Sequence, residues 1–299
     1  GKVISILGGS TCTFDGYIPV ADGFNLTHRP RYPQSNLLTD VNDTWWMQAA
    51  NDLGLRLLVN NAWSGSSLLH TRSGTVGAYV DRCVQLHDDT GDNAGEMPDI
   101  IGIQLGTNDY QYYKDTLGTA DIDYDTLIMA HGDGTYSYAE PKTSLEAAAI
   151  VLHKISVRYP NAEVYYLNLS KRVDITENTK GVLEAFNEGL AAVCARFGAH
   201  IVDIYDSAIT VEDFDTYIGD GRVHPNKMGM DAYTEAFKKA VLSNTAYQTE
   251  SYTVSFDLKN VQADYGTNKL VLSGDSFNVH LTAPPCCDMN VRVTMGGKD

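Results

Sequence analysis

Five apolar runs of strand length recur along most of the chain and alternate with helical patterns, and this alternation restricts the possible folds most strongly. Each run is short and continuously apolar, as is typical of strands buried on both faces of a sheet. The five runs are Val3–Leu7, Leu55–Val59, Ile100–Leu105, Val164–Leu169 and Ile201–Ile204. The helical patterns are Thr44–Leu53, Thr75–His87, Ser144–Tyr159, Glu177–Phe197 and Met228–Leu242. We therefore expect an α/β domain in which a doubly wound, five-stranded parallel sheet lies between two layers of helices.

The helical pattern over Ser144–Tyr159 carries its own boundary signals. Thr143 and Glu146 have the spacing of a capping box, in which each side chain accepts a hydrogen bond from the other residue's backbone. Pro160 disfavours helical backbone in the residue before it. The sequence thus predicts that this helix begins at Ser144 and ends before Pro160.

From about Thr249 the apolar residues follow a period of two, as in strands with one buried face. The alternating segments are Tyr252–Leu258, Lys269–Leu272, Phe277–Leu281 and Val291–Met295. We expect a main domain over residues 1–247 and a small antiparallel β module over residues 248–299. Since about fifty residues give only a marginal core, the module is expected either to pack on the main domain or to continue beyond Asp299 in a longer protein.

The charge balance limits the possible partners. The chain has 22 Lys and Arg residues against 38 Asp and Glu residues, which gives a net charge of -16. Such a chain repels phosphate backbones, so we do not expect nucleic acid as a partner. No apolar run approaches the ~20 residues that cross a bilayer, so we expect no membrane span. The five cysteines fit neither a zinc site nor a dense disulfide framework, and they leave the redox compartment open.

Polar motifs follow four of the five predicted strands in chain order. In chain order they are Gly8-Gly9-Ser10, Asn61-Ala62-Trp63-Ser64-Gly65, Gly106-Thr107-Asn108-Asp109 and His224-Pro225-Asn226. Ligands of doubly wound folds bind beyond the carboxyl ends of the strands. We therefore expect these four motifs to meet at one edge of the sheet.

Taken in order, the four motifs resemble those of the SGNH, or GDSL-type, hydrolase superfamily, whose four sequence blocks supply a serine, a glycine, an asparagine and a histidine. The corresponding residues here are Ser10, Gly65, Asn108 and His224. The segments Ser5–Ser10, Gly16–Pro19 and Thr44–Trp46 look like a bacterial GDSL-like lipase/acylhydrolase subfamily, and the resemblance covers about residues 1 to 245. It implies a flavodoxin-like version of the doubly wound sheet (the SGNH hydrolase fold) and a serine esterase activity.

Acyl transfer explains why these residue types are needed. A serine hydroxyl is a poor nucleophile until a base takes its proton, and a histidine such as His224 can do so at neutral pH. The resemblance implies an oxyanion hole made by the backbone N–H groups of Ser10 and Gly65 and by the amide of Asn108. This chemistry needs no cofactor and no metal ion, so we expect neither.

Two positions depart from the family pattern. Gly9 stands where the family usually has aspartate, so a looser turn around the nucleophile is expected. The family's second acid normally lies three residues before the histidine, but here that position is Gly221 and the nearest acid is Asp220, four residues before His224. Either Asp220 or a backbone carbonyl, such as that of Gly221, could orient the imidazole.

The substrate is less well defined by the sequence. Trp63, Tyr110 and Tyr112 are candidates to line the site, and the long polar stretch that continues to Lys142 is a candidate wall. We expect a short-chain ester, with an O-acyl group on a carbohydrate as the leading candidate and lipid or thioester substrates as the alternatives. The alternatives are a degenerate hydrolase that binds carbohydrate without turnover, and a protein that attaches to a surface through its β module. Residues Val291–Gly297 resemble repeats of bacterial surface and secreted proteins, which favours an exported or cell-surface protein.

Overall fold

The computed structural model describes residues 1–17, 30–70, 76–89, 94–173, 176–207 and 209–244, together with the backbone of short strands between residues 252 and 283. The main sheet has five parallel strands in the order β2-β1-β3-β6-β7. They are β1 (Val3–Gly8), β2 (Arg56–Ala62), β3 (Ile100–Gln104), β6 (Glu163–Leu167) and β7 (His200–Val202). This is the flavodoxin-like order, and its direction reverses between β1 and β3. The predicted α/β doubly wound sheet is therefore confirmed.

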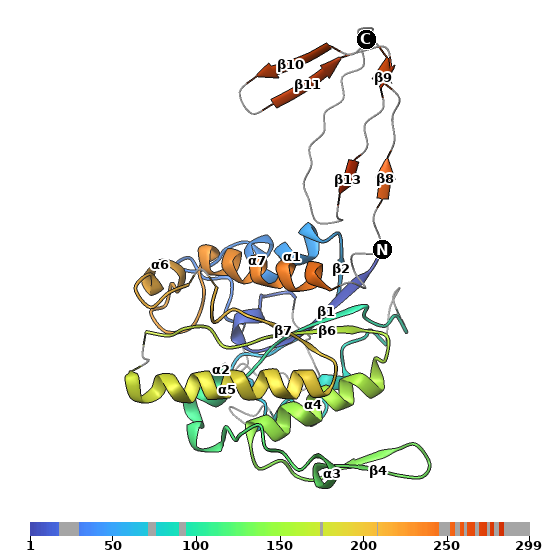
Figure 1. Ribbon diagram of the computed structural model, residues 1–299. Coiled ribbons are helices and arrows are strands. Elements are labelled where there is room, and N and C mark those ends of the chain that lie inside the picture. The colour runs from blue at the N-terminus through green and yellow to red at the C-terminus, as the bar shows by residue number, and fades with distance from the viewer. Residues whose placement is uncertain are drawn as a thin grey trace.

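Helices cover both faces of this sheet (Figure 1). One face carries α1 (Trp45–Asp52) and α7 (Lys227–Ser243), and the other carries α4 (Ser144–Arg158) and α5 (Glu177–Arg196). Because side chains alternate along a strand, Ile4 and Ile6 pack toward the first layer. Ile101 and Ile103 pack toward the second layer. Both faces are thus buried, which explains the continuous apolar runs.

The capping box of α4 is confirmed. The Thr143 side chain accepts a hydrogen bond from the backbone N–H of Glu146, and the Glu146 carboxylate accepts one from the backbone N–H of Thr143. The helix ends at Arg158, two residues before Pro160. The local signals therefore gave both ends of this helix correctly.

The expected helix over Thr75–His87 is wrong. In the described part of that segment, residues 76–87, the structure has turns and a single 3-10 turn, η4 (Arg82–Val84). The segment runs alongside the loop after β2. Ala78 N–H donates to the Ser67 carbonyl, and Gly77 packs so closely that a Cβ on it would lie 2.5 Å from the Leu69 carbonyl oxygen. The Arg82 side chain is buried beneath that loop. These tertiary contacts outweigh the helical pattern.

The polar stretch that follows β3 folds into short elements. They are α2 (Thr107–Tyr112), η6 (Lys114–Thr116), α3 (Tyr124–Leu127) and a hairpin of β4 (Ile128–Ala130) and β5 (Tyr136–Tyr138). The hairpin contacts α4, where the Tyr138 hydroxyl lies 2.9 Å from His153 Nδ1. Asp123 caps α3 by accepting from the backbone and side chain of Thr126. The remaining short helices of the described part are η1 (Ser10–Cys12), η3 (Val41–Asp43) and α6 (Phe214–Tyr217).

Short antiparallel strand pairs form the C-terminal region, as predicted. The pairs are β8 (Tyr252–Val254) with β13 (Leu281–Ala283), β9 (Leu258–Lys259) with β12 (Ser276–Phe277), and β10 (Gln262–Gly266) with β11 (Lys269–Ser273). The sequence pattern did not indicate β10. The segment Val291–Gly297 lies outside the described residues. Within the described chain, every helix is too short or too polar to cross a bilayer.

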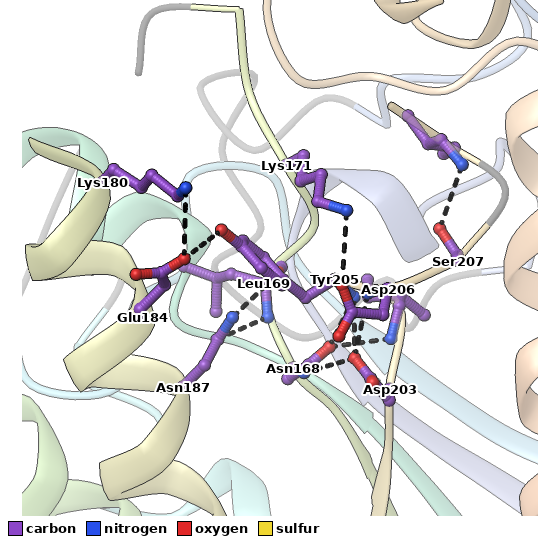
Figure 2. Close-up of polar contacts among 12 residues, drawn as sticks. Asn168, Leu169, Lys171, Lys180, Glu184, Asn187, Asp203, Tyr205, Asp206 and Ser207 are labelled. Carbon is purple, nitrogen blue, oxygen red and sulfur yellow. Dashed lines mark hydrogen bonds and ion pairs between the residues drawn. The ribbon is translucent and has the colours of Figure 1, made fainter. Parts of the chain in front are cut away.

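A set of polar contacts ties together the carboxyl ends of β6 and β7, and Figure 2 shows it. Asn168 accepts hydrogen bonds from the N–H groups of Ile204 and Tyr205 and donates to Asp203 at 3.0 Å. Asn187 of α5 bonds both the N–H and the carbonyl of Leu169 at 2.9 Å. We call Asn168, Asn187 and Asp203, with these backbone partners, the β6–β7 network. It lies at the same edge of the sheet as the end of β1.

Candidate active site

Ser10 begins η1 directly beyond the end of β1. The turn before it depends on Gly8, because a Cβ there would lie 2.6 Å from Cys12 Sγ. Cys12 is fully buried beneath the turn, so it fills space and does not line the site. Its carbonyl accepts a hydrogen bond from Asn60 at the end of β2. The packing of Cys12 and Asn60 beneath the turn therefore fixes the position of Ser10.

The turn around Ser10 is closed by hydrogen bonds although Gly9 replaces the usual aspartate. Gly9 N–H donates to the Gln104 carbonyl at 3.1 Å, and Cys12 N–H donates to the Gly9 carbonyl at 3.0 Å. The Thr13 side chain donates to the Ser10 carbonyl at 2.8 Å. The φ of Gly9 is -97°, which any residue can adopt. The expectation of a loose turn does not agree with these contacts.

His224 lies between Ser10 and Asp220. Its Nε2 is 2.8 Å from Ser10 Oγ, and its Nδ1 is 2.5 Å from Asp220 Oδ2. In this arrangement Nδ1–H donates to the carboxylate and Nε2 accepts the serine proton. Of the two orienting groups that the sequence left open, the structure places the Asp220 carboxylate on Nδ1.

A closed loop absorbs the extra residue between Asp220 and His224. Ile218 and Pro225 form an antiparallel bridge at its base, and Gly219 N–H donates to the His224 carbonyl at 3.1 Å. Gly221 has a φ of +65°, in the left-handed region that glycine adopts without a steric penalty. The tight turn brings a carboxylate four residues earlier back to the imidazole.

Asp220 is held by more than its contact with His224. Its Oδ1 accepts hydrogen bonds from the N–H groups of Arg222, Val223 and His224, at 3.0, 3.1 and 3.1 Å. Its Oδ2 also pairs with Arg31 Nη2 at 2.9 Å. Sequence reasoning missed Arg31, because it lies 189 positions away and no local pattern marks it. The carboxylate is thus fixed in position and remains ionised.

Burial and charge set the protonation of this pair. Burial raises the pKa of Asp220, but hydrogen bonds from the side chain and backbone of His224 outweigh that effect and hold its pKa well below the usual range. Burial lowers the pKa of His224 below its ordinary value near 6.5, while Asp220 opposes this and the charges of Arg31 and Arg222 add to it. His224 is therefore neutral at pH 7 and can act as a base.

The loop after β2 and the start of α2 supply donors beside Ser10. Asn108 uses one amide hydrogen to donate to the Ser66 carbonyl at 2.7 Å, which leaves its second amide hydrogen for another acceptor. Gly65 has a φ of +79°, so a glycine suits this position. Within the described chain, the backbone hydrogen bonds use neither the N–H of Ser10 nor that of Gly65. Three donors are thus available for an oxyanion.

Asp109, the last residue of the motif after β3, anchors the far end of the same loop. Its carboxylate is fully buried and accepts from the N–H groups of Leu68 and Leu69. It also accepts from the Ser144 hydroxyl at the start of α4, at 2.9 Å. The sequence motif contained this residue, but its role as an anchor depends on contacts that no spacing predicts.

A cleft of about 570 Å³ opens over these groups. Its lining is largely polar and comprises Ser10, Pro30, Arg31, Gln34, Ser64, Gly65, Asn108, Gln111, Tyr112, Asp220, Arg222, Val223 and His224. Of the three aromatic candidates, Tyr112 lines the cleft. Tyr110 is 1% exposed, on the opposite side of α2, and Trp63 lies outside the lining. Of the described insertion, only α2 reaches the cleft, so the polar stretch to Lys142 is not its wall.

Other titratable groups lie apart from this site. His70 contacts Thr116, and His87 and His153 contact Tyr159 and Tyr138. Among the residues that the structure describes, no group of three or more His, Cys, Asp or Glu side chains has the arrangement of a metal site.

Residues 2–242 match the family model of the GDSL-like Lipase/Acylhydrolase. A protein from Bacteroides ovatus described as a GDSL-like lipase is 26% identical, with a TM-score of 0.55, and the alignment covers 81% of this chain and 99% of that one. A similarly described protein from Bacteroides uniformis is 22% identical, with a TM-score of 0.57 and coverages of 82% and 97%. A family 2 carbohydrate esterase from Corynascus thermopiles is 21% identical, with a TM-score of 0.50 and coverages of 81% and 66%. A comparison with curated proteins finds no match.

Proposed function

The chain belongs to the GDSL-like lipase/acylhydrolase family, and from this premise we propose that it is a serine esterase that cleaves carboxylic esters through an acyl-enzyme on Ser10. The contact of Ser10 Oγ with His224 Nε2 at 2.8 Å, with Asp220 on the other imidazole nitrogen, carries this proposal. A nucleophile, a base and an orienting acid in hydrogen-bond contact are the parts that acyl transfer requires.

The first half of the reaction follows from these contacts. His224 Nε2 takes the proton of Ser10 Oγ while the oxygen attacks the ester carbonyl carbon, and the carbonyl oxygen becomes an oxyanion. The N–H groups of Ser10 and Gly65 and the amide of Asn108 donate to that oxyanion. When the carbon–oxygen bond to the alcohol breaks, the imidazolium returns the proton to the leaving alkoxide. An acyl ester on Ser10 remains.

The second half repeats the steps with water. His224 takes a proton from a water molecule, whose oxygen attacks the acyl-enzyme carbonyl, and the same donors hold the second oxyanion. The imidazolium then gives its proton to Ser10 Oγ as the acid leaves. Asp220 stays ionised throughout and stabilises the imidazolium in both halves.

We further propose an O-acyl group on a carbohydrate as the substrate. Pro30 and Val223 are the aliphatic side chains among the described residues that line the cleft, and they offer little surface to a long acyl chain. Gln34, Gln111 and Tyr112 contribute amide and hydroxyl groups to the lining, and such groups suit the hydroxyl-rich alcohol part of a carbohydrate ester. Three structural neighbours are described as family 2 carbohydrate esterases, which agrees with this choice.

Labelling with a fluorophosphonate probe tests the nucleophile. We expect the wild-type protein to be labelled on Ser10, and Ser10→Ala to lose both the label and esterase turnover. Ser170→Ala is a matched control, because Ser170 also follows a strand end but accepts a hydrogen bond from Tyr233. A wild-type protein that folds but takes no label would favour the alternative of a binding protein without turnover. Comparison of p-nitrophenyl acetate with longer acyl esters then tests the short acyl pocket.

A further inference from the structure

Arg82 is a buried cation that the proposed mechanism does not use. Its side chain lies beneath the loop that joins β2 to the segment before η4, and the residue is 3% exposed. Guanidinium groups remain charged in proteins, and although burial lowers the pKa of Arg82 to about 9, it is protonated at neutral pH. Among the described residues, no carboxylate pairs with it, and the ring of Trp63 lies 5.1 Å from its guanidinium carbon.

The guanidinium donates to groups on both sides of the proposed oxyanion hole. Its Nη2 donates to the Gly8 carbonyl at 3.1 Å, at the end of β1, and to the Asn61 carbonyl at 2.6 Å, at the end of β2. Its Nη1 donates to the hydroxyl of Ser66. One planar group thus joins the strand that leads to Ser10 with the loop that carries Gly65.

Ser66 connects Arg82 to the proposed oxyanion donors. It is the residue directly after Gly65, and its carbonyl accepts the hydrogen bond from Asn108. Its hydroxyl is held by Arg82, so Ser66 is bonded on one side by the guanidinium and on the other by the proposed oxyanion amide. The Gly8 carbonyl also accepts from Trp63 N–H at 3.1 Å, which fixes the start of the same loop.

Stability alone is a poor explanation for this arrangement. A buried cation without a carboxylate partner carries a large desolvation cost, which hydrogen bonds to neutral carbonyls and a hydroxyl offset only in part. Buried groups that cost stability in this way are concentrated at functional sites.

We propose that Arg82 is a positioning residue that holds Ser10 N–H, Gly65 N–H and the Asn108 amide in the geometry that receives the oxyanion. This inference rests on the proposed esterase function. It predicts that loss of the guanidinium lowers kcat and leaves KM nearly unchanged, because the misplaced donors act in the transition state.

Arg82→Met tests the proposal, with Lys154→Met as its matched control. Lys154 is also a cation that donates to backbone carbonyls of the same segment, those of Tyr79 and Val80, but it contacts neither Gly8 nor Ser66. Both variants are expected to lower the melting temperature. In protein shown to be folded, we expect Arg82→Met to reduce kcat on the order of 10²-fold, and Lys154→Met to change it less than about threefold.

Ser66→Ala provides a second test if Arg82→Met does not fold. It removes one hydroxyl and leaves the other guanidinium contacts, so we expect roughly a 10-fold fall in kcat with KM unchanged. Folded variants of Arg82 or Ser66 with the kcat of Lys154→Met would overturn the positioning role, while the esterase function would stand. Absence of Ser10 labelling and turnover in the wild-type protein would instead refute the proposed function itself.

Discussion

Two polar clusters lie at the same edge of the sheet, and they differ in whether their hydrogen-bond donors remain unpaired. In the β6–β7 network, Asn168, Asn187 and Asp203 bond to the backbone groups around them and close the ends of two strands (Figure 2). At the other end of the edge, the contacts around Ser10 leave two N–H groups and one amide hydrogen without a partner in the described chain, and they face a cleft. Strand-end polar residues thus serve stability in one cluster and present free donors in the other.

The largest expected effect on kcat concerns the Asp220 carboxylate, which contacts His224, in comparison with the Asp203 carboxylate of the β6–β7 network. In Asp220→Asn, the new amide would donate to His224 Nδ1, so the ring proton would move to Nε2 and block the base. We expect kcat to fall by up to ~10⁴-fold, with the fold retained.

Asp203→Asn is the control for this comparison. Asp203 accepts from the N–H groups of Tyr205 and Asp206 in the β6–β7 network, and has no contact with His224. We expect normal kcat and lower stability. Near-normal turnover in Asp220→Asn would show that the carboxylate does not orient the imidazole.

A matched pair of asparagines sharpens the comparison further. Asn108→Ala removes a proposed oxyanion donor, so we expect kcat to fall ~10²–10³-fold with a small change in stability. Asn168→Ala leaves the N–H groups of Ile204 and Tyr205 without their acceptor, so we expect a loss of about 1–3 kcal/mol in unfolding free energy with normal kcat. Steady-state kinetics and urea unfolding on both variants would measure the two effects. A kcat loss in Asn168→Ala equal to that in Asn108→Ala would remove the distinction between the clusters.

The sequence predicted the parts of this edge that follow directly from the strands. The five strand runs and the motifs that follow them place Ser10, Gly65, Asn108 and His224 near one another, because parallel strands end at one edge. It did not indicate Arg31 or Arg82, whose contacts join segments far apart in the chain. It also assigned Tyr110 and Tyr112 to one surface, although residues two positions apart on a helix such as α2 point to opposite sides. The tertiary contacts that turn residues 76–87 away from a helix have no local signature.

The smallest expected effect concerns the pH dependence at the two ends of the edge. Turnover needs neutral His224, so kcat/KM should fall as the pH drops through the pKa of His224, and that midpoint should lie below 6.5 because burial lowers this pKa. The charge of Arg222 adds to this lowering, so Arg222→Gln should raise the pKa and move the acid limb to higher pH. Lys171→Gln removes a cation that pairs with Asp206 beside the β6–β7 network, and it should leave the acid limb in place. Profiles of kcat/KM against pH for the three proteins measure the shift. Equal shifts in both variants would mean that the limb reports the overall charge of the protein, while a shift in Arg222→Gln alone would locate the titrating base beside Arg222 in the cleft.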